Sequence, residues 1–96
     1  MITRIVKMTF QPEKISDFIQ IFRSGKDTIR AFEGCLHVEL LNDISNPNIF
    51  CTYSKWESEE FLAKYRESDF FKLTWGKTKI LFAEKPEAWS LNSVEK

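Results

Sequence analysis

The spacing of apolar residues changes abruptly at Pro12, and this change constrains the fold more than any other feature of the chain. Residues 2–10 place apolar side chains at alternate positions, with Arg4 as the exception, which is the two-residue period of a strand. Over residues 15–29 the apolar side chains recur every three or four positions, which predicts a helix with one buried face. Gly34 favours an end of this helix just before it, because glycine readily adopts the left-handed conformation that follows many helices.

Two further strands are predicted at residues 35–42 and 48–56, on either side of a turn that contains Pro47. If the turn is centred on residues 43–47, residues whose numbers sum to about 91 face each other, and Cys35 lies opposite Trp56. The two faces of the hairpin are then Leu36, Val38, Leu40, Ile49, Cys51 and Tyr53 on one side, and Cys35, His37, Glu39, Leu41, Phe50, Thr52, Ser54 and Trp56 on the other. A slip of one residue would exchange the faces of one strand.

Two helices and a last strand are predicted in the C-terminal part of the chain. Ser58 and Ser68 are suitable N-cap residues, and the helix after Ser68 is expected to continue to about Phe82. Residues 87–91 are predicted to form the closing strand and residues 92–96 a frayed tail. The apolar residues of the second helix form two stripes, Phe70, Leu73, Ile80 and Leu81 in one and Phe71, Trp75 and Phe82 in the other.

The resulting order, βαββα(α)β, is the ferredoxin-like arrangement of one α+β domain over residues 1–96, with helices on one face of an antiparallel sheet. The chain has fourteen aromatic residues, 15% of its length, which is more than a monomer of this size readily buries. The uncovered face of the sheet is too apolar to remain in water, so we expect a homodimer that packs sheet against sheet. That face is expected to hold His37, Glu39, Phe50, Thr52 and Trp56.

Charge and cysteine content limit the partners that the sequence predicts. Basic and acidic residues number 14 each, without the basic excess that nucleic-acid binding requires. No apolar segment is long enough to cross a membrane, and no signal peptide is recognised, so we expect a cytoplasmic protein whose Cys35 and Cys51 are reduced thiols. No cluster of metal ligands and no nucleotide-binding glycine pattern occurs, so neither a metal nor a cofactor is expected.

Three short groups of residues resemble a known family. They are Phe32-x-Gly34-Cys35-Leu36-x-x-Glu39-Leu40, Trp56-Glu57-Ser58 and Ser68-x-x-Phe71. Their succession is similar to the antibiotic biosynthesis monooxygenase domain, and the likeness extends from the strand at residues 2–10 to Pro86-x-Ala88-Trp89. The resemblance implies a dimeric α+β barrel. For part of the family it also implies an oxygenase that needs no cofactor and acts on phenolic polyketides or quinols.

The resemblance argues against haem as the substrate. The haem-degrading branch of the family uses an Asn on the first strand, a Trp on the short helix and a His on the next helix. The first strand here has no Asn, and Tyr65 and Trp75 stand roughly where the Trp and the His would fall.

Oxygenation without a cofactor requires a group that accepts or hydrogen-bonds a phenolic proton, set among aromatic walls that keep water out. His37 is the candidate proton acceptor, because it is the only histidine and histidine titrates near neutral pH. The candidate substrate-binding residues are Tyr53, Trp56, Tyr65, Phe71 and Trp75. Packing in the core or in the dimer interface is the alternative role for each of these rings.

Three functions remain open at this point. The first is a monooxygenase that takes O₂ and a small aromatic molecule as substrates. The second is a non-catalytic module that holds a planar metabolite in the same pocket. The third is an isomerase or cyclase that needs the base but no O₂, and the fold does not distinguish among the three.

Overall fold

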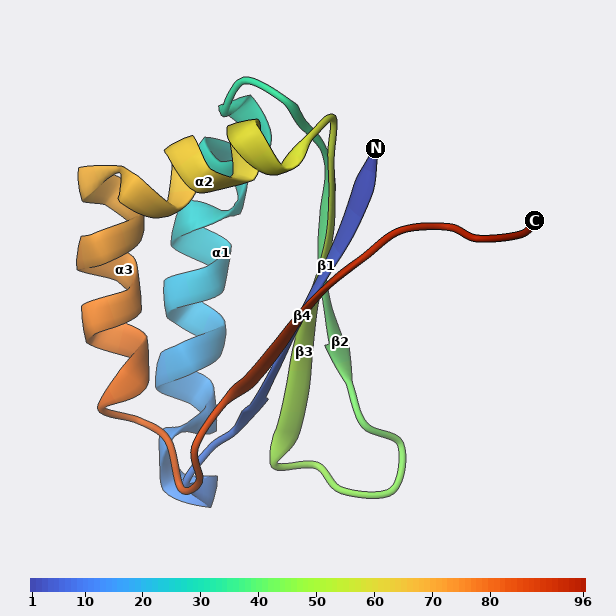
Figure 1. Cartoon of the computed structure of the whole chain (residues 1–96). Coiled ribbons are helices and arrows are strands. Elements are labelled where there is room, and N and C mark those ends of the chain that lie inside the picture. Colours follow the sequence, from blue (N-terminus) through green and yellow to red (C-terminus); the bar gives the residue numbers. More distant parts are fainter.

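The structure of the protein is a computed structural model that describes residues 1–96. Its elements are β1 (Ile2–Thr9), a 3₁₀ turn η1 (Pro12–Lys14), α1 (Ile15–Ala31), β2 (Cys35–Asn42), β3 (Ile49–Trp56), α2 (Glu59–Glu67), α3 (Asp69–Lys79) and β4 (Glu87–Leu91). The four strands form one antiparallel sheet in the order β2-β3-β1-β4. Figure 1 shows the sheet nearly edge-on, with the three helices on one side and the other side bare. The predicted ferredoxin-like α+β arrangement is confirmed.

The helix boundaries follow from local chemistry. Pro12 occupies the first turn of η1, where its missing N–H is not needed. Gly34 follows α1 with a φ of 85°, a conformation that only glycine adopts at little cost. Ser68 caps α3 as predicted, because its Oγ accepts a hydrogen bond of 3.1 Å from the backbone N–H of Phe71. Ser58 precedes α2 as predicted but makes no side-chain capping bond.

The predicted register of the β2–β3 hairpin is wrong by one residue. Val38 faces Ser54, so the paired residue numbers sum to 92 over most of the hairpin. The cause lies in the turn, where the Asp43 carboxylate accepts hydrogen bonds from the backbone N–H groups of Ser45 and Asn46, at 2.7 and 3.1 Å. The turn therefore needs one residue more than the prediction allowed.

This slip changes the face on which β3 side chains lie. Phe50, Thr52 and Trp56 point towards the helices, and not to the open face as predicted, since they share a face with Val38. A register shift between Cys35 and His37 restores the predicted pairing of Cys35 with Trp56. The open face holds His37 and Glu39 as predicted, but with Cys51, Tyr53 and Lys55 beside them.

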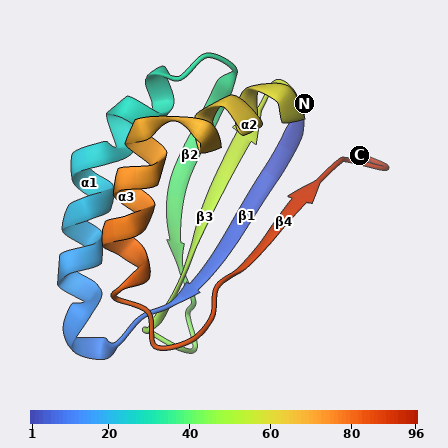
Figure 2. The same ribbon diagram turned by 60° about the vertical axis from the view of Figure 1, so that its left-hand side comes forward.

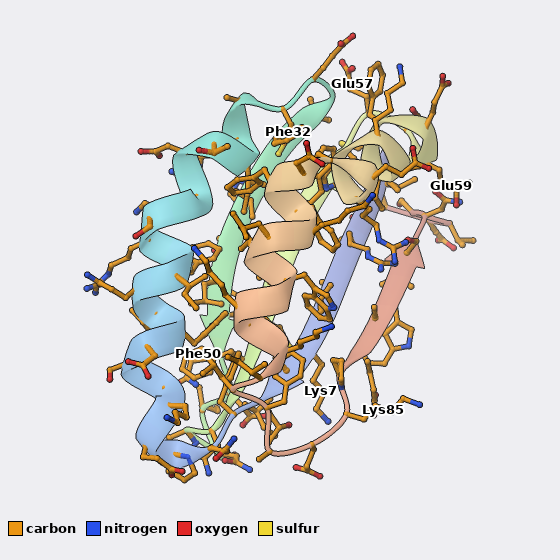
Figure 3. All side chains as sticks on the ribbon, turned by 90° about the vertical axis from the view of Figure 1, so that its left-hand side faces the viewer. Lys7, Phe32, Phe50, Glu57, Glu59 and Lys85 are labelled. Carbon is orange, nitrogen blue, oxygen red and sulfur yellow. The ribbon has the colours of Figure 1, made fainter.

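The core between the helices and the sheet consists of two apolar clusters. One contains Ile2, Ile29, Val38, Trp56 and Leu62, and the other contains Met8, Phe10, Phe18, Phe50 and Leu81. Figure 3 looks onto the helices and shows Phe32, which packs on the first cluster, at the end of the layer near α2, and Phe50 towards the opposite end. The space between these two ends is where a cavity forms.

Helix α3 ends at Lys79 and not near Phe82 as predicted. Leu73 and Ile80, which were expected in an apolar stripe with Phe70, are 64% and 71% exposed. Phe70 and Leu81 of the same stripe do pack inward, against the first and in the second core cluster. From the other predicted stripe, Phe71 and Trp75 of α3 also turn inward and line the cavity described below. None of the helices has the length and apolar character needed to cross a bilayer.

Substitution of Gly34 tests the junction between α1 and β2. A Cβ at this position would overlap the ring of Phe61, and the positive φ would strain any side chain. We expect Gly34→Ala to lower the free energy of unfolding by about 2–4 kcal/mol, the sum of left-handed backbone strain and overpacking. Gly76→Ala is the matched control, because a Cβ there meets nothing within 4 Å. Urea unfolding should show it unchanged or stabilised by up to about 1 kcal/mol, and equal effects at the two glycines would contradict this account.

Candidate functional site

A cavity of about 260 Å³ lies between the helices and the sheet. Its walls come from all four strands and all three helices, so it joins the two core clusters. Figure 2 shows α1 and α3 side by side over the sheet and β4 beyond the helices at one edge. The cavity reaches solvent at this edge, where the exposed residues Arg66, Glu87 and Ala88 line it. The principal lining residues are Arg4, Val6, Met8, Phe18, Phe22, Thr52, Ser54, Trp56, Tyr65, Arg66, Phe71, Thr74, Trp75, Thr78, Pro86 and Ala88.

Four aromatic rings form a continuous wall of this cavity, which we call the aromatic wall: Trp56, Tyr65, Phe71 and Trp75. Trp56 stacks on Tyr65 with 5.0 Å between ring centroids, and Tyr65 meets Phe71 edge to face at 5.2 Å. Phe71 and Trp75 are nearly parallel, at 8° and 6.0 Å. All four were predicted as substrate-binding residues, and the fold brings them together from β3, α2 and α3. Their role in binding is a proposal that follows below.

The Tyr65 side chain is mostly buried at the centre of the aromatic wall. Burial first, and then the nearby thiol of Cys35, raise the pKa of Tyr65 to about 12. The phenol is therefore protonated near neutral pH. In that state Tyr65 can donate a hydrogen bond to a ligand oxygen, but its phenolate is not available as a proton acceptor.

Two arginines that were not predicted as site residues also line the cavity. Arg4 lies on β1 and its Nη1 donates a 3.0 Å hydrogen bond to Ser90 Oγ on β4. Arg66 lies in the last turn of α2. One signal in the sequence pointed to Arg4, since it is the single charged residue on the buried parity of β1. No comparable signal exists for Arg66, because the end of an amphipathic helix commonly carries a basic residue.

The other two predicted site residues, His37 and Tyr53, lie on the opposite side of the sheet. His37 and Glu39 are both on the open face of β2, with His37 Nε2 2.9 Å from Glu39 Oε1. Their side chains are 46% and 48% exposed. Tyr53 lies near them on β3, with its ring centroid 5.8 Å from that of His37. The sheet therefore separates these three residues from the cavity and its aromatic wall.

Neither a metal centre nor a reactive thiol is formed by these residues. No group of three or more His, Cys, Asp or Glu side chains could hold a metal ion. Cys35 and Cys51 are free, and burial raises the pKa of both thiols, which disfavours the nucleophilic thiolate. The arrangement is suited to holding a flat ring against aromatic side chains, with polar groups at one end of the cavity.

The sequence of the chain matches one protein family. The model of the family described as "Antibiotic biosynthesis monooxygenase" matches residues 1–74. No protein with a curated description matches the sequence.

Solved structures match over nearly the whole chain. A conserved protein from Methanosarcina mazei Go1 is 24% identical with a TM-score of 0.89, over 95% of this chain and 91% of that one. A structure named antibiotic biosynthesis monooxygenase, 18% identical, has a TM-score of 0.92 over 99% and 100% of the two chains. Rv0793 from Mycobacterium tuberculosis, 15% identical, has a TM-score of 0.90 over 99% and 96%. Identities this low establish the fold alone.

The raised pKa of Tyr65 predicts a loss of stability at high pH. The unfolded phenol ionises near its model value of 10.0 and the folded one near 12, so above pH 10 the unfolded state releases its proton first. The free energy of unfolding should fall between about pH 10 and pH 12, by at most about 2–3 kcal/mol at ~1.4 kcal/mol per pKa unit. Urea unfolding at stepped pH should show this loss in the wild type and a shallower one in Tyr65→Phe. Parallel curves for the two proteins would refute the assignment.

Proposed function

Because the chain belongs to the antibiotic biosynthesis monooxygenase family, we propose that it is a cofactor-independent monooxygenase that oxidises a small phenol- or quinol-like molecule with O₂. The observation that supports this most directly is the aromatic wall, which faces a cavity of about 260 Å³. Such a wall holds a planar ring by stacking and edge contacts. The same wall excludes water from the reacting atoms.

For this reaction the protein has to bind the substrate and stabilise the substrate's anion. The deprotonated ring passes an electron to O₂, and the two radicals combine into a peroxide. The peroxide forms on a ring carbon that carries hydrogen and takes up a proton. That carbon then loses its hydrogen as a proton while the O–O bond breaks, which releases water and leaves a carbonyl. One oxygen atom enters the product, the other leaves as water, and the substrate supplies all the electrons, so the reaction needs no reductant.

A non-catalytic binding module is the second candidate, and one observation favours it. No histidine and no buried carboxylate lines the cavity, so its walls offer no evident general base. An isomerase or cyclase would need such a base and gains no support from the cavity. The two remaining candidates share the same ligand site and differ only in the reaction with O₂.

We further propose that the protein is a homodimer with the open faces of the two sheets packed together, in keeping with the family. Leu41, Trp89 and Leu91 on this face are 41%, 43% and 48% exposed. A second copy would bury these side chains together with His37 and Tyr53. In such a dimer His37 would lie inside the interface. The prediction that His37 accepts the substrate proton would then place the reaction in that interface, and the variants below test it.

Oxygen uptake tests the proposed reaction and the place where it occurs. Quinols and anthrones should be screened in an oxygen electrode, and the best substrate carried to the variants. We expect Trp75→Ala to lower kcat/KM at least tenfold, or ~1.4 kcal/mol, because it removes one ring of the aromatic wall. Leu73→Ala, an exposed position on the same helix, should behave as the wild type.

His37→Ala distinguishes the two places where the reaction can occur, the cavity and the open face of the sheet. Uptake that survives this change but not Trp75→Ala puts the reaction in the cavity. The reverse pattern puts it on the open face, with His37 as the proton acceptor. Failure of the wild type to consume O₂ with every substrate would leave the binding module as the better description.

The dimer is tested by light scattering. The wild type at micromolar concentration should have twice the 11.4 kDa mass of one chain. Trp89→Glu should shift it to the mass of one chain, because it replaces a large apolar side chain of the proposed interface with a charge that a second copy would have to bury. Ile80→Glu, a matched change at an exposed residue on the helical side, should remain a dimer. A wild type with the mass of a single chain would show the proposal to be wrong.

A further inference from the structure

Two arginines line the cavity and no carboxylate neutralises either of them. Arg4 lies on β1 and Arg66 in the last turn of α2. The two ion pairs of the chain lie elsewhere, on α1 and on the open face of β2. In a chain with a net charge of zero, two unpaired cations in one cavity are a local concentration of positive charge.

The single acidic residue among those that line the cavity is not placed to compensate them. Glu87 stands opposite Lys7 in the β1–β4 ladder, so its side chain shares the open face with that lysine. Side chains of adjacent positions on a strand point to opposite faces. Arg4 and Ala88 therefore point into the helical side, and Glu87 points away from it.

The charged side chain of Arg4 contributes little to the stability of the fold. Burial first, and then the positive charge of Arg66, lower the pKa of Arg4 below its usual value, which means that the fold disfavours the charged form. A guanidinium has five N–H donors, and the side-chain hydrogen bonds of Arg4 consist of one, to Ser90 Oγ. An apolar residue would continue the pattern of Ile2, Val6 and Met8 on the same face.

We infer that Arg4 and Arg66 form the anion-binding end of the cavity, and that its ligand is a planar aromatic anion, a phenolate or an aryl carboxylate of one or two rings. The charged oxygen accepts hydrogen bonds from the guanidinium groups, and the ring lies against the aromatic wall. An apolar cavity of roughly 150 Å³ holds benzene, so about 260 Å³ has room for one or two rings. The inference rests on the proposed function in taking this cavity as the ligand site.

The arginines also make a general base in the cavity walls unnecessary. A positive charge beside an acid favours its ionised form and lowers its pKa by about 1–3 units. A phenol bound at this end loses its proton to solvent, and the anion that reacts with O₂ is held without a histidine. The protonated hydroxyl of Tyr65 is an additional donor in the same cavity.

Paired probes of equal shape measure the preference for charge. Naphthalene-2-carboxylate and the neutral naphthalene-2-carboxamide should be titrated into the protein by calorimetry. We expect the carboxylate to bind the wild type at least tenfold more tightly. This preference should disappear in Arg4→Gln and in Arg66→Gln. It should persist in Arg4→Lys, which keeps the charge, and in Arg23→Gln, an exposed arginine of α1 outside the cavity.

A second probe distinguishes a phenolate site from one limited to carboxylates. 4-Nitrophenol absorbs visible light only as its phenolate, so its pKa in the bound state can be followed directly. We expect the pKa of the bound phenol to fall by at least about one unit in the wild type and to return to its free value in the Arg4→Gln/Arg66→Gln double variant. Equal affinity for the two naphthalene probes together with an unshifted phenol would overturn the inference, as would failure of all three probes to bind at millimolar concentration.

Measurements of stability and of oxygen uptake distinguish this inference from a structural role for Arg4 and from the proposed oxygenation. Arg4→Gln should unfold at nearly the same urea concentration as the wild type, since the one side-chain hydrogen bond that it loses, to Ser90 Oγ, is exposed; a large destabilisation would point to a structural role for Arg4 instead. A preference for anions without O₂ uptake supports this inference and overturns the proposed oxygenation. O₂ uptake by a wild type that binds anionic and neutral probes equally supports the oxygenation and overturns the inference.

Discussion

The stacked pair of Trp56 and Tyr65 determines where the rest of the site can lie. Trp56 is completely buried and its Nε1 donates a 3.0 Å hydrogen bond to Ser54 Oγ, so its ring is fixed by packing and by a satisfied polar group. Tyr65 stacks on it at 5.0 Å, which joins α2 to β3. The turn of α2 that holds Tyr65 also holds Arg66. One buried tryptophan therefore positions both the aromatic wall and one of the two cations.

The cavity persists because α3 leans on α1 and leaves the β4 edge of the sheet uncovered. At Gly25 on α1 an added Cβ would lie 3.1 Å from Cζ of Phe70 on α3, so the two helices approach closely there. The opposite side of α3 then faces β1 and β4 with Phe71 and Trp75, and Figures 2 and 3 show no helix over β4. Small side chains at the edge, such as Ala88, do not fill the remaining space. A core packed only for stability would close such a gap.

Local patterns were enough to predict the topology, the elements apart from the end of α3, and the stripe of Phe71 and Trp75, but they placed Trp56 on the wrong face of the sheet. Periodicity identifies Phe71 and Trp75 as a separate stripe whatever α3 packs against. The face of β3 was not predictable, because it depends on whether the Asp43 turn has one residue more or less, and a side-chain hydrogen bond decides that. Arg66 was missed for a related reason. Its place at the cavity arises from the angle between α2 and the sheet, which no local pattern encodes.

Strand β4 links the proposed ligand site to the proposed dimer, because one of its faces belongs to each. Strand β4 pairs only with β1 and all five of its residues are exposed, so a single ladder holds it in place. Its open face carries Trp89, and its other face carries Ala88 and Ser90, the latter bonded to Arg4. A second copy that buried Trp89 would fix β4 and, through it, the guanidinium of Arg4. Alternation along one strand thus gives the proposed interface and the proposed anion-binding end separate side chains but a common backbone. If the dimer forms as proposed, its assembly would also order the wall of the cavity that β4 provides.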